Sequence, residues 1–165
     1  MFQHANENEE CQGMGTTLIA AVCTDEFVSI GHIGDSRAYL GNEHGFTAKT
    51  EDHSLVQELV RSGQISEKEA EHHPRKNVVL RVLGTEPEIK MDLHTLQIEE
   101  GQSVLLCSDG LSNKVSADEM NQLLQEDGTV ETKADAFVQL ANERGGEDNI
   151  SIALIHFPNE MMSDG

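Results

Sequence analysis

Apolar and polar residues alternate in short blocks along this chain, and the blocks predict its strands. Residues 16–23 and 27–33 are two apolar runs separated by a short polar turn, which is typical of a β-hairpin. Glycine-rich turn residues separate two further predicted strands at 37–40 and 46–48. Residues 1–15 are polar and contain glycine, and we expect no regular structure in them.

Helices are predicted by capping residues and by apolar stripes. A serine followed three residues later by Gln or Glu is an N-terminal capping signal, and it occurs at Ser54, Ser66 and Ser116. Apolar residues recur at helical spacing from 134 to 141, just before a pair of glycines that would end the helix. Residues 75–84 are basic and apolar by turns and predict no regular element.

Two aspartates lie at the ends of predicted buried strands. Residues 104–107 are a continuous apolar run and Asp109 follows them, whereas Asp148 stands just before the last predicted strand at 150–155. If these strands are antiparallel neighbours, the two carboxylates meet at one edge of a sheet, where the Gly and Asn that follow them allow sharp turns. Like charges so close need a cation. The competing interpretation is that both are ordinary turn dipeptides.

Asp35 is a third candidate, because it interrupts a strand pattern directly after a glycine. A β-bulge with Asp35 paired to Arg37 is the alternative. His32 and His53 lie near the acidic motifs and could tune a site or serve the structure only. There is no Gly-x-Ser-x-Gly serine and no cysteine in a basic setting, which favours a metal-activated water over a protein nucleophile.

Composition narrows the class of protein. Thirty acidic against eleven basic residues give a formal charge of −19, which argues against binding to nucleic acid or to an anionic membrane. Three cysteines, an odd number, and the absence of any long apolar stretch predict a reduced, cytoplasmic chain without membrane insertion. The length of 165 residues fits one domain.

Five motifs, in this order, resemble the metal-dependent (type 2C, PPM family) protein serine/threonine phosphatases. Each motif alone is weak, but five in sequence across nearly the whole chain are specific, and the stretch 71–77 is similar to the Gram-positive bacterial branch. The motifs are residues 13–17 (GMGTT), 32–40 (HIGDSRAYL), 50–54 (TEDHS), 105–111 (LLCSDGL) and 146–150 (GEDNI).

The resemblance implies an α+β fold, a four-layer sandwich of two antiparallel sheets flanked by helices. Residues 1–165 would form a partial catalytic domain, with a flap at about residues 55–77. The implied cofactors are two Mn²⁺ or Mg²⁺ ions, with a third also allowed. Asp109 would bind the second and third ions, Asp148 the second and Asp35 the third. The implied nucleophile is a water activated by the ions, so no catalytic side chain is expected.

The resemblance also implies that part of the active site lies upstream of residue 1. The family has an early Arg that holds the substrate phosphate and an Asp-Gly-x-Gly segment whose Asp bridges two ions, and these 165 residues contain neither. A catalytically inactive, truncated binding module or a gene fragment is therefore the alternative. A calcium-binding or structural acidic β-protein would explain the charge but not the ordered motifs. The implied substrates are phosphoserine and phosphothreonine on proteins, and the implied partners are a bacterial Ser/Thr kinase and its targets.

Overall fold

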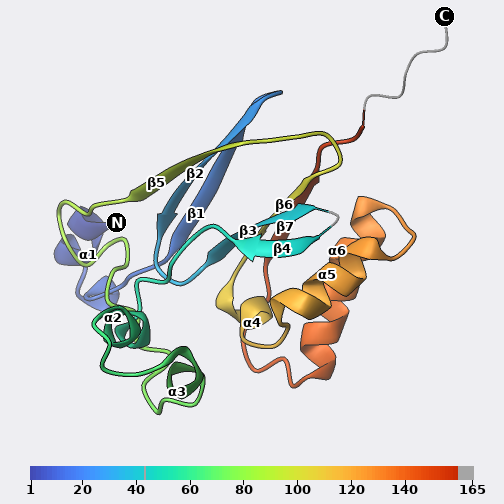
Figure 1. Ribbon diagram of the computed structural model, residues 1–165. Helices are drawn as coiled ribbons and strands as arrows, with labels where there is room; N and C mark the ends of the chain where they lie inside the picture. The colour runs from blue at the N-terminus through green and yellow to red at the C-terminus, as the bar shows by residue number, and fades with distance from the viewer. Residues whose placement is uncertain (43, 160–165) are drawn as a thin grey trace, which may run out of the picture. The chain divides into compact units, whose positions relative to one another are not determined.

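A computed structural model describes residues 1–42 and 44–159, in which blocks of helices and blocks of strands follow one another along the chain (Figure 1). The strands are β1 Leu18–Cys23, β2 Phe27–Ile33, β3 Arg37–Asn42, β4 Gly45–Ala48, β5 Asp92–Gln97, β6 Ser103–Cys107 and β7 Ile152–His156. The helices are α1 Phe2–Glu7, the 3₁₀ helix η1 Glu9–Cys11, α2 Leu55–Arg61, α3 Glu67–Glu71, α4 Asp109–Ser112, α5 Ala117–Gln125 and α6 Val130–Glu143. None of these helices is long and apolar enough to cross a membrane.

The strands form two antiparallel sheets, ordered β1-β2-β5 and β4-β3-β6-β7. In the second sheet β6 lies between β3 and β7, so both of its edges are paired, as the continuous apolar run predicted. This arrangement confirms the predicted α+β class with two antiparallel sheets and helices.

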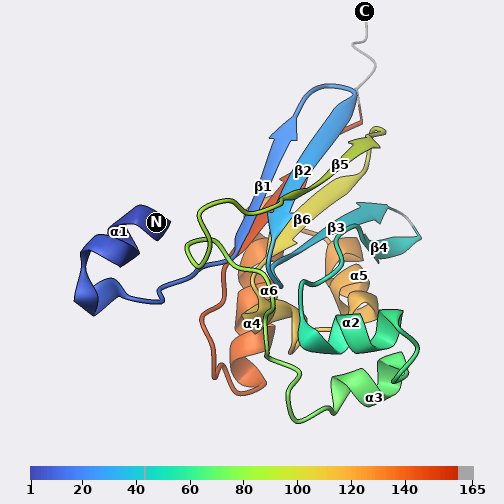
Figure 2. The same cartoon turned by 90° about the vertical axis from the view of Figure 1, so that its left-hand side faces the viewer.

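The chain packs as two compact units. Among the described residues, the first unit comprises Met1–Ala20, Gly31–Ser36 and Glu51–Leu93, and the second comprises Ala21–Ile30, residues 37–42 and 44–50, and residues 94–159. Helices α2 and α3 of the first unit lie side by side (Figure 2). In the second unit, α5 packs on β4 and α6 packs on β7 (Figure 1).

The core of the second unit forms where the two long helices meet the four-stranded sheet. Phe137 of α6, Met120 of α5 and Leu105 of β6 are fully buried in it. Burying side chains of this size contributes about 1.5–3 kcal/mol each. The predicted stripe on α6 is confirmed, since Phe137 and Ala141 face this core. Because Leu105 and Cys107 belong to this core, it fixes the position of β6, the strand that Asp109 follows.

The predicted caps begin their helices as expected. At Ser66 and Ser116 the capping box is complete, with the serine side chain accepting from the backbone and the glutamate accepting in return. The Ser54 hydroxyl accepts a hydrogen bond from the Gln57 N–H at 3.3 Å, but the Gln57 side chain does not bond to the Ser54 backbone. Only half of this predicted capping box therefore forms.

Several sequence predictions were wrong at the level of elements. The start of the chain is not irregular throughout, because α1 and η1 form within residues 2–11, with Ala5 buried, whereas residues 12–15 belong to no helix or strand. Strand β5 was missed because its side chains are mostly exposed and show no apolar alternation, so its pairing in the sheet defines it. The irregular segment 75–84 is nevertheless tied down by isolated bridges that include Ser54 with Val79. The last strand begins at Ile152 instead of residue 150.

Candidate active site

The pairing of β6 with β7 sets the positions of two acidic residues of the second unit, Asp109 and Asp148. These strands are antiparallel, and Cys107 at the end of β6 lies opposite Ile152 at the start of β7. Asp109 follows β6 and Asp148 precedes β7, so both lie beyond the same end of the sheet. The prediction that the two strands are antiparallel neighbours is therefore confirmed.

Ser108 binds the two chain segments together beyond that end. Its N–H donates to the Ser151 carbonyl at 2.9 Å, and its hydroxyl donates to the Asn149 carbonyl at 3.1 Å. The same hydroxyl accepts from the Ser151 N–H at 3.0 Å. These bonds occupy the backbone groups that would otherwise extend β7, which explains why the strand starts two residues later than predicted.

Gly110 is required for close approach and not for a turn. Its backbone is helical, in the first turn of α4, and it is absent from the glycines with positive φ. A Cβ at this position would lie 2.4 Å from the Asn149 carbonyl oxygen. The predicted sharp turn at this glycine was wrong, because the missing side chain instead lets the backbone at Asn149 pack directly against α4.

Replacing Gly110 by Ala is expected to destabilise the chain. The new methyl group meets a backbone carbonyl that Ser108 holds in place, and such overpacking costs about 1–3 kcal/mol. At roughly 2–4 °C per kcal/mol for a chain of this size, thermal unfolding should shift down by several degrees. Gly31→Ala is the matched control, because its nearest neighbour is the flexible Met91 side chain at 2.9 Å. Equal melting temperatures for the two variants would contradict the close-approach role.

Asp148 acts electrostatically on Asp109. Burial raises the pKa of the half-buried Asp109, and the nearby charge of Asp148 raises it further. Arg37, paired in β3 with Cys107, acts in the opposite direction on the same pKa. The Asn113 amide donates to Asp109 Oδ2 at 3.3 Å and orients the carboxylate. Burial and a second negative charge disfavour the ionised form, which is the situation that a bound cation relieves.

Asp148 is exposed and lies on a loop with its own anchors. Its Oδ1 accepts from the Asn149 N–H at 2.7 Å. The preceding Glu147 forms an ion pair with Lys114. At the end of α6, Arg144 pairs with Glu119 and donates to the Lys114 carbonyl at 2.6 Å. These contacts tie the start of the loop to α5 and to the segment before it.

Asp35 belongs to the first unit, whereas Asp109 and Asp148 belong to the second. It is half-buried and lies in a bend between β2 and β3, so the alternative of a β-bulge is wrong, whereas the pairing of Asp35 with Arg37 stays a prediction. Its predicted approach to Asp109 through a shared ion stays a prediction. Within residues 1–42 and 44–159, no three His, Cys, Asp or Glu side chains are grouped closely enough to hold a metal ion.

The donor set nevertheless fits a hard divalent cation. Asp109 and Asp148 offer carboxylate oxygens, which are the ligands that Mg²⁺ and Mn²⁺ prefer. Asp109 is also disfavoured as an isolated charge by its burial. Two carboxylates leave most coordination positions for water, substrate or further protein ligands.

The supporting residues were missed by sequence reasoning. Ser108 has a usable signal, since serine is a common residue at the start of a helix, and Ser108 stands directly before α4, although its hydroxyl bonds to residues 149 and 151 instead of capping that helix. Asn113 could have been found because it lies four residues after Asp109, on the same side of a short helix. Arg37 acts through the pairing of β3 with β6, which no sequence spacing reveals.

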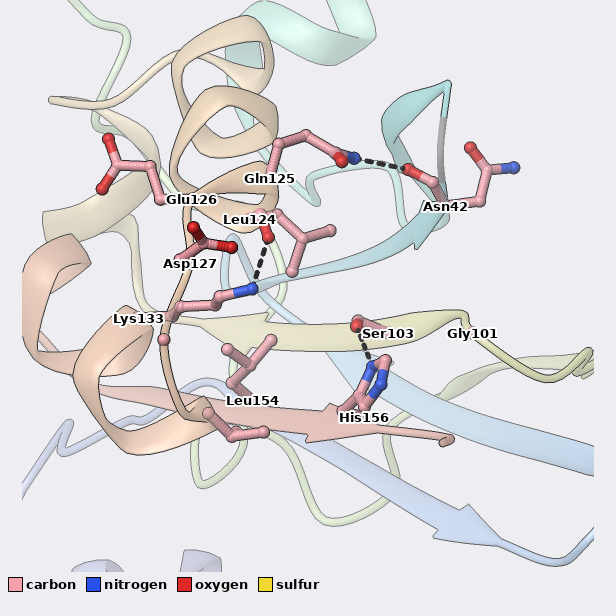
Figure 3. A pocket seen from close by; sticks show the side chains of 12 residues that line it. Asn42, Gly101, Ser103, Leu124, Gln125, Glu126, Asp127, Lys133, Leu154 and His156 are labelled. Atoms are coloured by element: carbon pink, nitrogen blue, oxygen red, sulfur yellow. Dashed lines mark hydrogen bonds between the residues drawn. The ribbon is translucent and has the colours of Figure 1, made fainter. Parts of the chain in front are cut away.

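A pocket of about 400 Å³ lies at the opposite end of β6, away from these carboxylates (Figure 3). Ser103 Oγ is 3.0 Å from His156 Nδ1 there, and Lys133 Nζ donates to the Leu124 carbonyl at 2.6 Å. Ser103 and His156 form a cross-strand pair, and Lys133 fastens α6 to the end of α5. Their polar groups are thus engaged in holding the fold.

Comparison with known proteins gives consistent matches. Residues 2–150 match the family model of protein phosphatase 2C. The serine/threonine phosphatase stp of Listeria monocytogenes is 45% identical over 152 residues, covering 92% of this chain and 60% of that protein. The structure of Stp1 from Staphylococcus aureus is similar with a TM-score of 0.92 at 37% identity, covering 96% of this chain and 62% of that one. The catalytic domain of the phosphatase PstP, in complex with two manganese ions, gives a TM-score of 0.82 at 34% identity, covering 92% and 63%. This chain therefore spans about 60% of the length of the Listeria relative.

Proposed function

Because this chain belongs to the protein phosphatase 2C family, we propose that it forms part of a metal-dependent protein serine/threonine phosphatase. The observation that carries the proposal is the pair of carboxylates, Asp109 and Asp148, beyond one end of the paired strands β6 and β7. The relatives named as serine/threonine phosphatases support phosphoserine and phosphothreonine on proteins as substrates. A bacterial kinase partner and a cytoplasmic location stay predictions.

Asp109 and Asp148 are the proposed ligands of Mn²⁺ or Mg²⁺ in the second unit, and Asp35 is the proposed metal ligand of the first unit. When bound, such ions act as Lewis acids and supply a hydroxide nucleophile from water at neutral pH, so no covalent phosphoenzyme is needed. The chain contributes orientation. Asn113 directs the Asp109 carboxylate, and Ser108 keeps the Asn149 backbone against α4, next to Asp148.

The charge of the chain also bears on substrate binding. A formal charge of −19 repels a phosphate dianion, and cations held between the carboxylates would reverse the local field. Arg37, which acts electrostatically on Asp109, adds positive charge at the same end of the sheet.

A catalytically inactive binding module is the second candidate. Two observations favour it for this polypeptide by itself: the chain spans about 60% of its Listeria relative, and the described residues contain no group of three metal-ligating side chains. Two carboxylates can bind a cation weakly without holding two ions at reaction distance. The two candidates therefore differ in activity and not in the first step of metal binding.

Titration of the 165-residue chain with Mn²⁺ tests the proposed ligands directly. Paramagnetic broadening of NMR signals should appear first at Asp109 and Asp148, and excess chelator should reverse it. Asp109→Asn should weaken Mn²⁺ binding by more than about tenfold, because even the loss of a residue that only hydrogen-bonds to a ligand lowers metal affinity by about 10–100-fold.

Asp135→Asn on the exposed side of α6 is the control, because it makes the same change of charge away from the site. With thirty acidic residues in the chain, diffuse binding is the main competitor. Broadening spread evenly over exposed carboxylates, and equal in both variants, would refute the ligand assignment.

A further inference from the structure

His53 forms two hydrogen bonds with Gly34, the residue before Asp35 in the bend between β2 and β3. The His53 N–H donates to the Gly34 carbonyl at 2.8 Å, and the Gly34 N–H donates to His53 Nδ1 at 3.0 Å. Gly34 has φ of +111°, and a Cβ there would lie 2.4 Å from Thr17 Cγ2. Both polar backbone groups of Gly34 are therefore bound by one residue, and no other amino acid fits its place.

The other side of the bend is held by Thr17. Its Oγ1 lies 3.0 Å from the hydroxyl of the buried Ser36. Asp35 thus stands between two residues whose positions are set by side chains of other segments of the same unit. The direction in which its side chain leaves the backbone depends on both contacts.

The ring of His53 is itself oriented by Asp92. Because Nδ1 accepts from Gly34, the ring proton lies on Nε2, which donates to Asp92 Oδ2 at 3.1 Å. Arg81 Nη1 is 3.0 Å from the same Nε2, but two donors cannot bond, so Arg81 donates to Asp92 Oδ1 at 3.1 Å. The hydrogen bond from His53, together with Arg81, lowers the pKa of Asp92. A charged carboxylate therefore fixes the ring tautomer.

His32 packs against the same ring. The two ring centroids are 4.6 Å apart with an interplanar angle of 32°, and His32 is fully buried. Among the described residues its ring nitrogens make no hydrogen bond of ordinary geometry; burial, followed by His53, lowers the pKa of His32, and the nearby Gly34 backbone acts in the opposite direction. Charged groups that act on His32 are Asp52 and Asp92. A neutral, buried ring beside His53 limits its movement and supports a fixed hydrogen bond to Gly34.

We propose that His53 is a positioning residue which, oriented by Asp92, holds Gly34 and thereby sets the direction of the Asp35 carboxylate. The inference rests on the proposed function, in which Asp35 binds an ion. His53 does not touch the reacting atoms in this role. It contributes by holding the Asp35 carboxylate in its binding orientation before an ion arrives. Replacing a residue that orients a metal ligand typically lowers metal affinity by about 10–100-fold.

The hydrogen bond can be measured in the unmodified chain. A scalar coupling between the Gly34 amide nitrogen and His53 Nδ1 is expected, together with slow exchange of the Gly34 amide proton. A folded chain with no such coupling and with fast exchange would overturn the proposal without any variant being made.

Two substitutions separate orientation from simple packing. His53→Asn keeps an acceptor near the position of Nδ1 and loses the contact with Asp92, whereas His53→Gln reaches toward Asp92 and loses the acceptor for Gly34. His53→Gln should raise the exchange rate of the Gly34 amide proton by about tenfold or more. The Mn²⁺ concentration needed to broaden the Asp35 signals should rise by a similar factor. His53→Asn should stay within about threefold of the parent for both quantities.

Equal effects of the two variants, or no effect of His53→Gln, would assign His53 a packing role only. If His53→Gln does not fold, Asp92→Ala takes its place, because it removes the acceptor for His53 Nε2–H; faster Gly34 exchange is expected, and unchanged exchange would refute the role. If Mn²⁺ affects no signal of Asp35 in the parent, the metal role of Asp35 fails. The coupling and exchange data then still decide whether His53 holds the bend.

Discussion

Asp109→Asn is expected to abolish most phosphatase activity in a protein that contains this chain together with the rest of the family's catalytic domain. Asparagine keeps the shape and one carbonyl oxygen but removes a full charge from a site that must hold dications. Mutating a residue that only hydrogen-bonds to a metal ligand typically lowers metal affinity or activity by about 10–100-fold, so loss of a direct ligand should lower activity at least about 100-fold. Activity measured against Mn²⁺ concentration checks this, because affinity should fall before the maximal rate does.

Folding should survive the same substitution. Burial and Asp148 raise the pKa of Asp109, so its ionised form is less stable in the folded chain than in water. Neutralising it removes that penalty, and thermal unfolding in chelator should be unchanged or slightly higher. If Asp109→Asn instead unfolds the protein in chelator, Asp109 is a structural turn residue and not a ligand.

Two matched variants make the comparison specific. Asp135→Asn changes the charge equally on exposed α6 and should keep parental activity. Asn113→Ala should lie between the two, because the Asn113 amide donates to Asp109 Oδ2 and orients it without replacing it. Near-parental activity and metal dependence of Asp109→Asn would refute its assignment as a ligand.

The 165-residue chain by itself is expected to hydrolyse an aryl phosphate with Mn²⁺ at least about 100-fold more slowly than a completed protein, meaning a fusion of this chain with the part of the Listeria phosphatase that it does not match. The reason is that Asp109 and Asp148 alone would leave most coordination positions of two ions without protein ligands. Joining the chain to the part of the Listeria phosphatase that it does not match should restore activity. Excess chelator should abolish this activity, and Mn²⁺ should recover it.

The outcomes separate the two candidate functions. A completed protein in which the Asp of the Asp-Gly-x-Gly segment is replaced by Asn is the control and should be as slow as the chain alone. A folded but inactive completed protein would favour the binding module. Robust hydrolysis by the chain alone would contradict the need for a further ligand, and activity that persists in chelator would count against any metal mechanism.

The sequence by itself predicted the elements whose stability is local. The capping boxes at Ser66 and Ser116 formed as expected, because their hydrogen bonds join residues only three positions apart. The apolar run of β6 and the stripe of α6 were readable for the same reason, since periodicity reports which side of one element is buried. The prediction that Asp109 and Asp148 lie beyond one end of the sheet followed from one assumption, that their strands are antiparallel neighbours, and this assumption was correct.

Tertiary structure alone decided the contacts between distant segments. β5 is a strand by virtue of its sheet neighbour, and its six residues carry no alternation that would predict it. Gly110 is needed because the Asn149 backbone approaches it, and His53 is oriented by an aspartate 39 residues away in the sequence. A single sequence encodes local hydrogen bonds and periodicity directly. Which distant groups meet is set by the free energy of packing the whole chain, so no spacing along the sequence records it.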